Sequence, residues 1–323
     1  MCWRKAAAGG RRRATLSRKP VDEKPSFETD MDAETGETVE VSPLIRRVVA
    51  GNAGPMTFKG TCTYLVGRGE VAVIDPGPND PDHVAAILRA LDGERVSHIL
   101  VTHTHIDHSP AAAALKSATG ARIVGCGPHR PSRPLAEGEI NRLEGSGDRS
   151  YAPDAVMSEG DAVTGAGWTL AAVATPGHTA NHLAFALREE NALFSGDHVM
   201  AWSTSFVGPP DGNMASYMAS LEKVRDLGHA VFWPGHGGPV RDPQRFTRAL
   251  ISHRRFREAM ILERVREGDR GIEAIVERVY PGLAPGLRRA AALNVFAHLE
   301  DLVARDAVRT DGPLALDAVF LPA

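Results

Sequence analysis

The sequence predicts an α+β protein in which two β-sheets pack face to face with helices outside, followed by a small, mainly helical domain. Between residues 44 and 233, short apolar runs bounded by Gly-containing turns alternate with amphipathic stretches, as in strand meanders interrupted by helices. After about Arg241, apolar residues recur at helical spacing in stretches separated by Pro-Gly pairs. A chain of 323 residues has room for one large or two modest domains.

Residues 1–42 are predicted to be a disordered N-terminal extension. The first twenty residues are basic and contain no acid, whereas Asp22 to Glu40 is strongly acidic. Neither half shows apolar periodicity, so neither is expected to bury a core. A flexible tail or an over-extended start codon is the favoured interpretation, and a transit peptide is the alternative.

The first domain is expected to cover residues 43–240. The expected strands are short apolar runs, most of them bounded by Gly, Pro or Asp, and each expected helix carries apolar residues three and four apart. The strands are expected at 45–50, 57–66, 70–74, 97–101, 122–125, 161–164, 168–174, 182–187, 191–195 and 230–233. The helices are expected at 80–91, 110–119 and 214–227. Residues 128–153 are rich in Gly, Pro and charge and are expected to form a loop.

The second domain is expected to cover residues 241–323. Apolar residues at helical spacing predict one long helix over 243–267. Two further helices are expected at 271–280 and 287–304, and a short hairpin at 308–320. Three helices followed by a small β-wing resemble a winged-helix domain.

A cluster of metal-binding residue types follows the strand expected at 97–101. Four candidate ligands stand within six residues: His103, His105, Asp107 and His108. Imidazole nitrogens and carboxylate oxygens are ligands of borderline metals such as zinc. His103 and His105 alternate and can point the same way, whereas Asp107 and His108 come half a turn later and can point to a second position nearby. The chain has no Cys pair that would complete a structural zinc site.

The pattern His-x-His-x-Asp-His after an apolar strand resembles the signature of the metallo-β-lactamase fold hydrolases. That family requires a further His, an Asp and a last His, in this order along the chain. Gly-flanked motifs after apolar runs supply them as His178, Asp197 and His236. The resemblance implies an αββα four-layer metallo-beta-lactamase sandwich. The C-terminal part is similar to the winged-helix domain of the beta-lactamase-like protein 2 branch.

The resemblance also implies a dinuclear metal centre with two Zn²⁺ per chain, iron or manganese being alternatives by ligand type. It assigns His103, His105 and His178 to one metal, Asp107, His108 and His236 to the other, and Asp197 to a bridge between them. A hydroxide shared by the two metals would attack an electrophilic carbonyl or phosphorus. Asp107 is the expected catalytic carboxylate, which would orient this hydroxide or carry a proton. Asp197 stands where the commonest zinc β-lactamases carry Cys, which favours the broader dinuclear hydrolases.

Five further residues are predicted to support the metals or contact substrate: Asp75, His198, Trp202, Ser203 and Thr204. Asp75 ends a buried strand and is expected to hold a ligand His by a hydrogen bond, with a plain turn as the alternative. The segment after Asp197 is expected to lie over the metals, where Trp202 would stack on a base or an acyl chain or simply pack at the rim. The histidines without a motif partner are interpreted as structural: His83, His98, His129, His182, His229, His253 and His298.

Three functions are compatible with these residues. The first is a dinuclear hydrolase that uses a metal-bridging hydroxide on an ester, thioester, lactone or similar bond. The second, implied by the branch resemblance, is an endoribonuclease that cleaves single-stranded RNA. It draws on five arginines that precede the first acid of the long helix and form either a phosphate-binding face or a solvated one: Arg245, Arg248, Arg254, Arg255 and Arg257. The third, a nucleic-acid-binding module without catalysis, is disfavoured by the complete ligand set.

Composition limits the partners and the cellular compartment that are expected for this protein. The net charge of −3 does not indicate a general polyanion binder, and three scattered cysteines indicate a reducing, cytoplasmic compartment. No apolar run has the length of a membrane span or of a signal peptide, so no membrane partner is expected. The expected partners are a small acyl substrate or single-stranded RNA, and a homodimer is left open.

Overall fold

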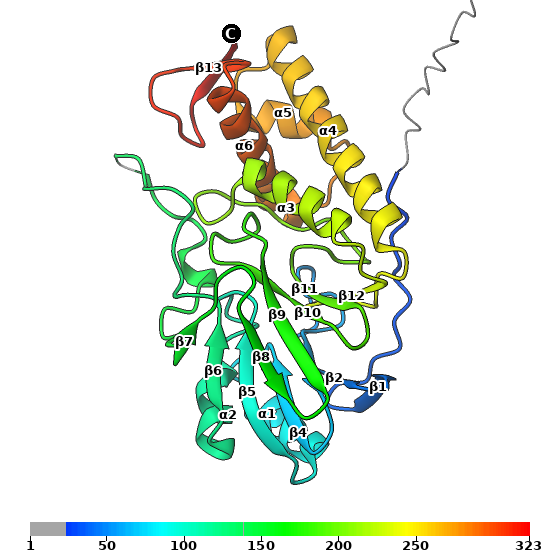
Figure 1. The fold of residues 1–323 in the computed structure, drawn as a ribbon. Helices are drawn as coiled ribbons and strands as arrows, with labels where there is room; N and C mark the ends of the chain where they lie inside the picture. The colour runs from blue at the N-terminus through cyan, green and yellow to red at the C-terminus, as the bar shows by residue number, and fades with distance from the viewer. Residues whose placement is uncertain (1–23, 138) are drawn as a thin grey trace, which may run out of the picture.

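Two β-sheets form the centre of the molecule, in a computed structural model that describes residues 24–137 and 139–323 (Figure 1). The first sheet has seven strands in the order β1-β2-β3-β4-β5-β6-β7, and the second has five in the order β12-β11-β10-β9-β8. Neighbours from β1 to β4 are antiparallel and those from β4 to β7 are parallel. In the second sheet only β11 and β12 are parallel. The predicted α+β sandwich is confirmed.

Each expected strand is present near its expected position, and two further strands, β1 and β7, were not expected. The first sheet contains β1 (Thr38–Ser42), β2 (Ile45–Val49), β3 (Cys62–Val66), β4 (Glu70–Ile74), β5 (Arg95–Val101), β6 (Arg122–Gly125) and β7 (Ala155–Val156). The second contains β8 (Ala162–Gly165), β9 (Trp168–Ala174), β10 (Leu183–Leu187), β11 (Ala192–Gly196) and β12 (Val231–Pro234). The strand expected at 57–66 begins only at Cys62, because residues 54–60 form a turn closed by hydrogen bonds between Gly54 and Phe58 and between Gly60 and Thr57.

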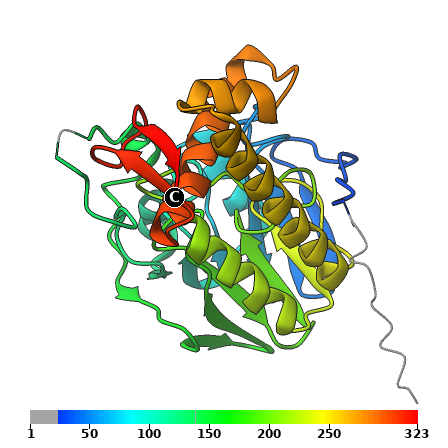
Figure 2. The ribbon, with the colours of Figure 1, turned by 90° about the horizontal axis from the view of Figure 1, so that it is seen from above.

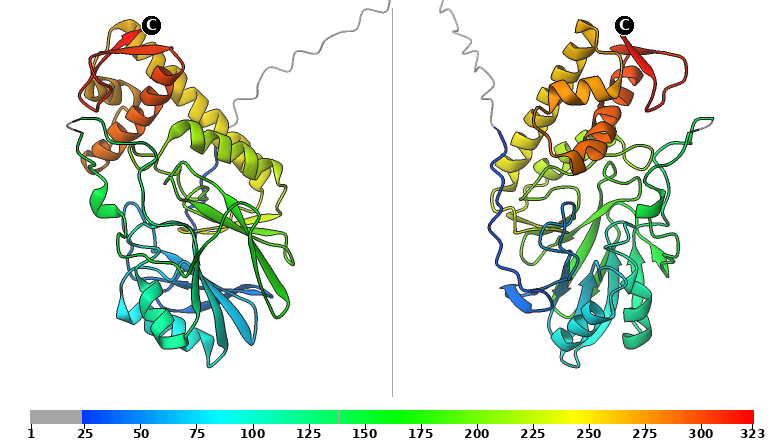
Figure 3. Two further views of the ribbon diagram at one scale, coloured as in Figure 1. Left: turned by 60° about the vertical axis from the view of Figure 1, so that its left-hand side comes forward. Right: turned by 180° about the vertical axis from the view of Figure 1, so that it is seen from behind.

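Helices cover the outer faces of both sheets (Figure 3). On the first sheet, α1 (Pro81–Leu91) packs against β2, and α2 (Ala111–Thr119) packs against β5 and β6. On the second sheet, α3 (Met214–Asp226) lies beside the long helix α4 (Pro243–Glu267), as Figures 1 and 2 show. Within the described part of the chain, none of the helices combines the length and apolar character needed to cross a bilayer.

The C-terminal domain sits over one end of the sandwich (Figures 1 and 3). It comprises most of α4, then α5 (Ile272–Val279), the 3-10 turn η2 (Pro285–Leu287), α6 (Arg288–Ala304) and the hairpin of β13 (Val308–Asp311) and β14 (Val319–Pro322). These elements have a core of their own, to which Ile275, Phe296 and Phe320 belong. The predicted three helices and β-wing are confirmed.

Helix α4 connects the two halves of the molecule. Leu250, in its first half, packs with side chains of α3 and the second sheet. Ile261 and Val265, in its second half, belong to the C-terminal core. The division predicted at residue 241 falls just before this helix and stays a prediction, because α4 contributes to both cores.

The N-terminal segment differs from its prediction. Disorder over 1–42 is wrong for residues 24–42, and residues 1–23 lie outside the described residues. Strand β1 pairs with β2, and the side chain of Met31 is 5% exposed. The acidic side chains of this segment face solvent, so their charge does not prevent its apolar residues from packing.

A chain that begins at residue 43 is expected to be less stable than one that begins at residue 24. The shorter chain loses β1 and the burial of Met31, which alone contributes about 1.5–3 kcal/mol to the free energy of unfolding. We expect the midpoint of thermal unfolding to fall by roughly 5 °C or more, measured by calorimetry. Equal midpoints would show that residues 24–42 add no stability.

Candidate metal centre

Four loops at one end of the sandwich bring the predicted ligands together. Residues 102–108 follow β5 of the first sheet, and His178, Asp197 and His236 follow β9, β11 and β12 of the second. Because β9 and β11 both run antiparallel to β10, and β12 runs parallel to β11, their carboxyl ends meet at the same edge. The two sheets therefore present their ligand loops to each other.

The first group of ligands comprises His103, His105, His178 and Asp197. One candidate ligand atom from each of the four lies within 4.8 Å of the others. The Nδ1 atom of His105 is 3.0 Å from Nε2 of His103 and 3.0 Å from Nε2 of His178. The Asp197 carboxylate lies 3.7 Å from the His178 ring. The three histidines are the set predicted for one metal, and Asp197 is the residue predicted to bridge the two metals.

The second group comprises Asp107, His108 and His236, whose candidate ligand atoms also lie within 4.8 Å of one another. The Oδ2 atom of Asp107 is 3.2 Å from Nε2 of His236 and 3.5 Å from Nε2 of His108. Asp197 again lies alongside, with its two oxygens 3.5 Å from Nε2 of His108 and 3.4 Å from Nε2 of His236. Asp197 thus stands between the two groups.

Hydrogen bonds on the far side of the rings orient three of the imidazoles. The Nδ1 atoms bond to oxygen acceptors: His178 to the Phe206 carbonyl (2.6 Å), His236 to the Gly60 carbonyl (3.2 Å) and His108 to the Asp75 carboxylate (2.9 Å). A ring whose Nδ1–H donates outward presents the lone pair of Nε2 toward the centre. This is the form in which imidazole coordinates a metal.

Asp75 holds the base of the ligand loop. Besides the bond from His108, its carboxylate accepts hydrogen bonds from the backbone N–H and the hydroxyl of Thr102, at 2.7 and 2.8 Å. Its backbone has a φ of +49°, which is costly for a residue with a side chain. The predicted hydrogen bond between Asp75 and a ligand His is therefore present.

The charge and the burial of the clustered side chains suit them to bind cations. Burial lowers the pKa of His105 to about 3, which keeps its ring neutral. Although burial acts in the opposite direction, the carboxylates of Asp197 and Asp107 raise the pKa of His236 to about 10. The Oδ1 atom of Asp197 is buried and accepts no hydrogen bond from any described residue. A buried carboxylate oxygen without a donor is costly, and a divalent metal ion would satisfy it.

At two glycines of the ligand motifs there is no room for a side chain. A Cβ on Gly235 would lie 2.5 Å from Oδ1 of Asp197 and 2.6 Å from the His108 ring. A Cβ on Gly177 would lie 2.3 Å from the backbone of Tyr217, at a φ of +142°. The Gly residues beside His178 and His236 therefore allow backbone to approach the cluster and the neighbouring helix α3 closely.

A cavity of about 790 Å³ opens onto the cluster. Trp202, Ser203 and Thr204 line it, where the sequence predicted them, and Trp202 stacks on Phe58 with ring centres 5.0 Å apart. His198 does not line the cavity; its ring packs on Tyr217 with centroids 4.8 Å apart. The rest of the wall is mainly apolar and comes from both domains: Pro55, Met56, Ile106, Leu143, Met200, Phe206, Tyr280, Leu283, Leu287 and Leu293.

Sequence reasoning missed two residues that support the site. His182, interpreted as structural, accepts a hydrogen bond from the backbone N–H of Asp197 at 3.2 Å. Arg254 of α4 is 2% exposed and donates to the carbonyl of Ser205, whose hydroxyl donates to the carbonyl of Asp197. The position of Arg254 on the buried side of a long amphipathic helix was the only signal of this role in the sequence.

The arginines of α4 do not form one phosphate-binding face. Arg254 is buried, Arg255 pairs with Glu222 at 2.9 Å, and Arg257 donates to the Val279 carbonyl at 2.7 Å. Arg257 also lies over the ring of Tyr280, 4.5 Å from its centre. Three of the five arginines that were considered for a phosphate-binding or a solvated face are therefore used in contacts within the protein.

Comparison with known proteins agrees with this geometry. The sequence model of the Metallo-beta-lactamase superfamily matches residues 56–236. The chain belongs to the metallo-beta-lactamase superfamily. The model of the beta-lactamase associated winged helix domain matches residues 272–313. Both predicted resemblances are thereby confirmed.

Several relatives cover most of the chain. Lactamase-like protein aptB of Emericella nidulans is 34% identical over 72% of this chain and 70% of its own length. Atrochrysone carboxyl ACP thioesterase dmxR1 of Cryptosporiopsis is 30% identical over 86% and 83%. A beta-lactamase-like protein 2 homolog of Caenorhabditis elegans is 30% identical over 79% and 82%. The crystal structure of a metallo-beta-lactamase family protein from Thermus thermophilus, 25% identical, matches 88% of this chain and 100% of its own with a TM-score of 0.71.

Replacing Asp75 is expected to weaken metal binding. Asp75→Asn removes the charge that orients His108, and loss of such a supporting carboxylate typically lowers metal affinity about 10- to 100-fold. Competition with a chromogenic chelator measures this affinity. Asp82→Asn, at an exposed position in the first turn of α1, is the matched control. Equal zinc affinity in Asp75→Asn and the control would contradict the role of Asp75.

Replacing Arg254 is expected to loosen the segment over the metals. Arg254→Met removes the donor to the Ser205 carbonyl, next to Phe206, whose carbonyl orients His178. We expect faster hydrogen exchange in residues 201–213 by mass spectrometry, together with a loss of about 1–3 kcal/mol of stability. Arg255→Met, at the exposed neighbouring position, should change neither. Unchanged exchange in Arg254→Met would show that the segment is held by other contacts.

Proposed function

We propose that this chain is a dinuclear metal-dependent hydrolase that cleaves acyl thioesters and related esters or lactones. The observation that carries the proposal is the cavity of about 790 Å³, which has metal-ligand side chains on one wall and mainly apolar side chains elsewhere. Its volume is in the range of small-molecule sites, and its apolar wall suits an acyl group. Relatives named as atrochrysone carboxyl ACP thioesterases, 30% and 31% identical, support a thioester as the bond cleaved.

The seven predicted ligands would hold two metal ions, in the two groups already described. We infer zinc, with iron and manganese compatible with the same imidazole and carboxylate ligands. The chemistry supplied by bound divalent metals is Lewis-acid activation of water and of the carbonyl that is attacked. Side chains of the protein would orient the substrate and transfer protons.

Asp107 is the residue we assign to proton transfer. Its side chain is 21% exposed, compared with 9% for Asp197, so it is the more accessible of the two carboxylates in the cluster. The hydroxyl of Thr61 donates to its Oδ2 at 3.3 Å and limits its rotation. A carboxylate held here can orient the attacking water and accept its proton. Trp202 and Phe206 cover the cavity wall beside it and would shield the acyl group from bulk water.

Cleavage of single-stranded RNA receives less support from the structure. That alternative drew on the arginines of α4, of which Arg254, Arg255 and Arg257 are engaged within the protein. A single strand is normally bound along a basic groove with several phosphate contacts and stacking platforms. A binding module without catalysis is disfavoured by the assembled ligand groups.

The reaction is tested with zinc-loaded protein and three substrates: an acyl-N-acetylcysteamine thioester, a lactone and end-labelled single-stranded RNA. We expect thioester hydrolysis that is lost on chelation, restored by zinc, and reduced at least about 100-fold in Asp107→Ala. Thr61→Ser, which keeps the hydroxyl beside Asp107, is the control for the fold. RNA cleavage that requires Asp107, without turnover of any acyl substrate, would overturn the proposal in favour of the endoribonuclease.

A further inference from the structure

Two arginines from different domains meet at the rim of the metal-site cavity. Arg142 lies in the loop between β6 and β7, and Arg289 is the second residue of α6. The Nη2 atom of Arg289 donates to the backbone carbonyl of Arg142 at 2.8 Å. Both residues line the cavity and both are exposed, so their charges stand at its entrance.

Neither guanidinium is paired with a carboxylate in the part of the chain that the structure describes. Among the described residues, no carboxylate forms an ion pair with Arg142 or Arg289, whereas nearby Arg133 pairs with both Glu139 and Glu300. The carboxylates among the described lining residues of this cavity are Asp107 and Asp197, and both belong to the metal cluster. The rim is therefore positively charged and the wall beyond it is apolar.

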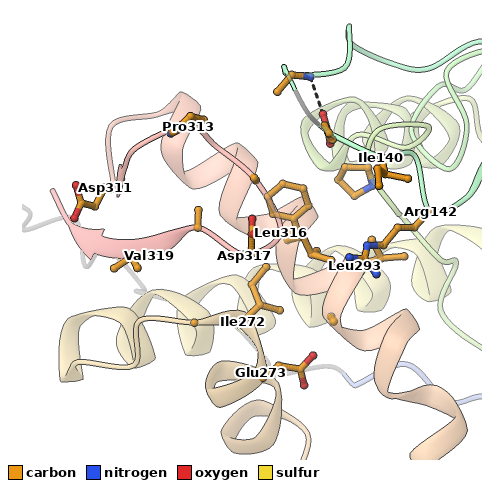
Figure 4. Close-up of a pocket in the computed structure, with 18 of the residues that line it drawn as sticks. Ile140, Arg142, Ile272, Glu273, Leu293, Asp311, Pro313, Leu316, Asp317 and Val319 are labelled. Carbon is orange, nitrogen blue, oxygen red and sulfur yellow. Dashed lines mark hydrogen bonds between the residues drawn. The ribbon is translucent and has the colours of Figure 1, made fainter.

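A second cavity of about 900 Å³, shown in Figure 4, shares Arg142 and Leu293 with the first. It is bounded by loop 136–142, α5, α6 and the β13–β14 hairpin. Its lining contains several acids: Glu137, Glu139, Glu273, Asp311 and Asp317. Acidic side chains around this second cavity disfavour an anionic group there, whereas the described lining of the first cavity has no carboxylate outside the metal cluster.

We propose that Arg142 and Arg289 form a subsite for the phosphate of a pantetheine-type thiol, the leaving group of an acyl thioester. This inference rests on the proposed function. Guanidinium groups bind phosphate oxygens through paired, charge-assisted hydrogen bonds, which makes two neighbouring arginines suited to a phosphate monoester or diester. The acyl part occupies the apolar interior, the thioester lies at the metal centre, and the thiol arm leaves through the rim.

The position at the rim favours this ligand over two others. A carboxylate on the acyl group would be carried into the apolar interior, away from both arginines. An RNA strand would require contacts to a series of phosphates, whereas the two arginines meet at one point and serve a single phosphate. The arm of a carrier-linked thioester must project out of the cavity, and that path passes the rim.

Binding of two probes tests the subsite without turnover. The probes are S-methyl-4′-phosphopantetheine and S-methylpantetheine, which differ only in the phosphate and have no free thiol to bind zinc. Calorimetry on zinc-loaded protein is expected to show about 10- to 100-fold tighter binding of the phosphorylated probe. In the double variant Arg142→Ala/Arg289→Ala, the affinities for the phosphorylated and the unphosphorylated probe should become equal to within about twofold. Equal affinities in the unmodified protein would overturn the proposal.

The matched control is Arg149→Ala/Arg288→Ala. Arg149 lies in the same loop as Arg142, Arg288 precedes Arg289, and both are exposed and outside the cavity lining. This control should keep the full preference for the phosphorylated probe. Loss of the preference in the control would show that general positive charge, and not this subsite, attracts the phosphate. Tight, Arg142- and Arg289-dependent binding of a single-stranded oligonucleotide in place of the phosphorylated probe would also overturn the proposal.

Measurements of turnover distinguish a failure of the proposed subsite from a failure of the proposed reaction. Thioesters of one acyl group with 4′-phosphopantetheine and with pantetheine are compared by kcat/KM. We expect the ratio of the two values to favour the phosphorylated thioester and to fall toward one in Arg142→Ala/Arg289→Ala. Hydrolysis of both thioesters with a ratio near one in the unmodified protein overturns the subsite and leaves the thioesterase. Phosphate-dependent binding without hydrolysis of either thioester keeps the subsite and overturns the reaction.

Discussion

The hydrogen bonds that converge on Asp75 are the constraint on which the metal site depends. Asp75 directly follows β4, and the parallel neighbour β5 ends where the ligand loop begins. One carboxylate accepts from the backbone and hydroxyl of Thr102 and from the ring of His108. It therefore fixes both where the loop starts and how one of its ligands is turned. The strained φ of +49° at Asp75, which costs about 1–3 kcal/mol, is the local consequence of aiming this side chain.

The family resemblance selected the candidate ligands from the sequence, and the structure brings them together because each follows a strand. A side chain directly after a strand end is placed at the sheet edge, and the chain repeats this arrangement at His178, Asp197 and His236. Strand boundaries were easy to find for the same reason, since buried strands are short apolar runs with Gly nearby. The pairing of His103 with His178 and of His108 with His236 came from the family resemblance, because spacing alone does not show which sheet edges face each other.

What the sequence could not show depends on contacts between distant segments. The acidic stretch before β1 has a disordered composition, yet Met31 is buried and the backbone of Glu28 bonds to Ala201. A few anchors suffice to order such a segment when a finished surface is available for them. Arg254 is a similar case, because its partners are a loop carbonyl and the side chain of Asn294, neither of which is near it in sequence. The sequence left Arg254 on either a phosphate-binding or a solvated face, whereas tertiary packing buries it.

The C-terminal domain explains why the ligand set alone does not define the substrate. Its fold resembles a winged helix, a class often associated with nucleic acid, yet residues of the first half of α6 form part of the wall over the metal centre. Leu287, Leu293 and Asn294 face the same cavity as Trp202 and Phe206 of the catalytic domain. One fold can host many reactions, so the loops that carry the candidate ligands do not by themselves identify the substrate. At the junction of the two domains, α6 contributes Leu293 to the apolar wall and Arg289 to the lining, so the proposed selection of substrate depends on both domains.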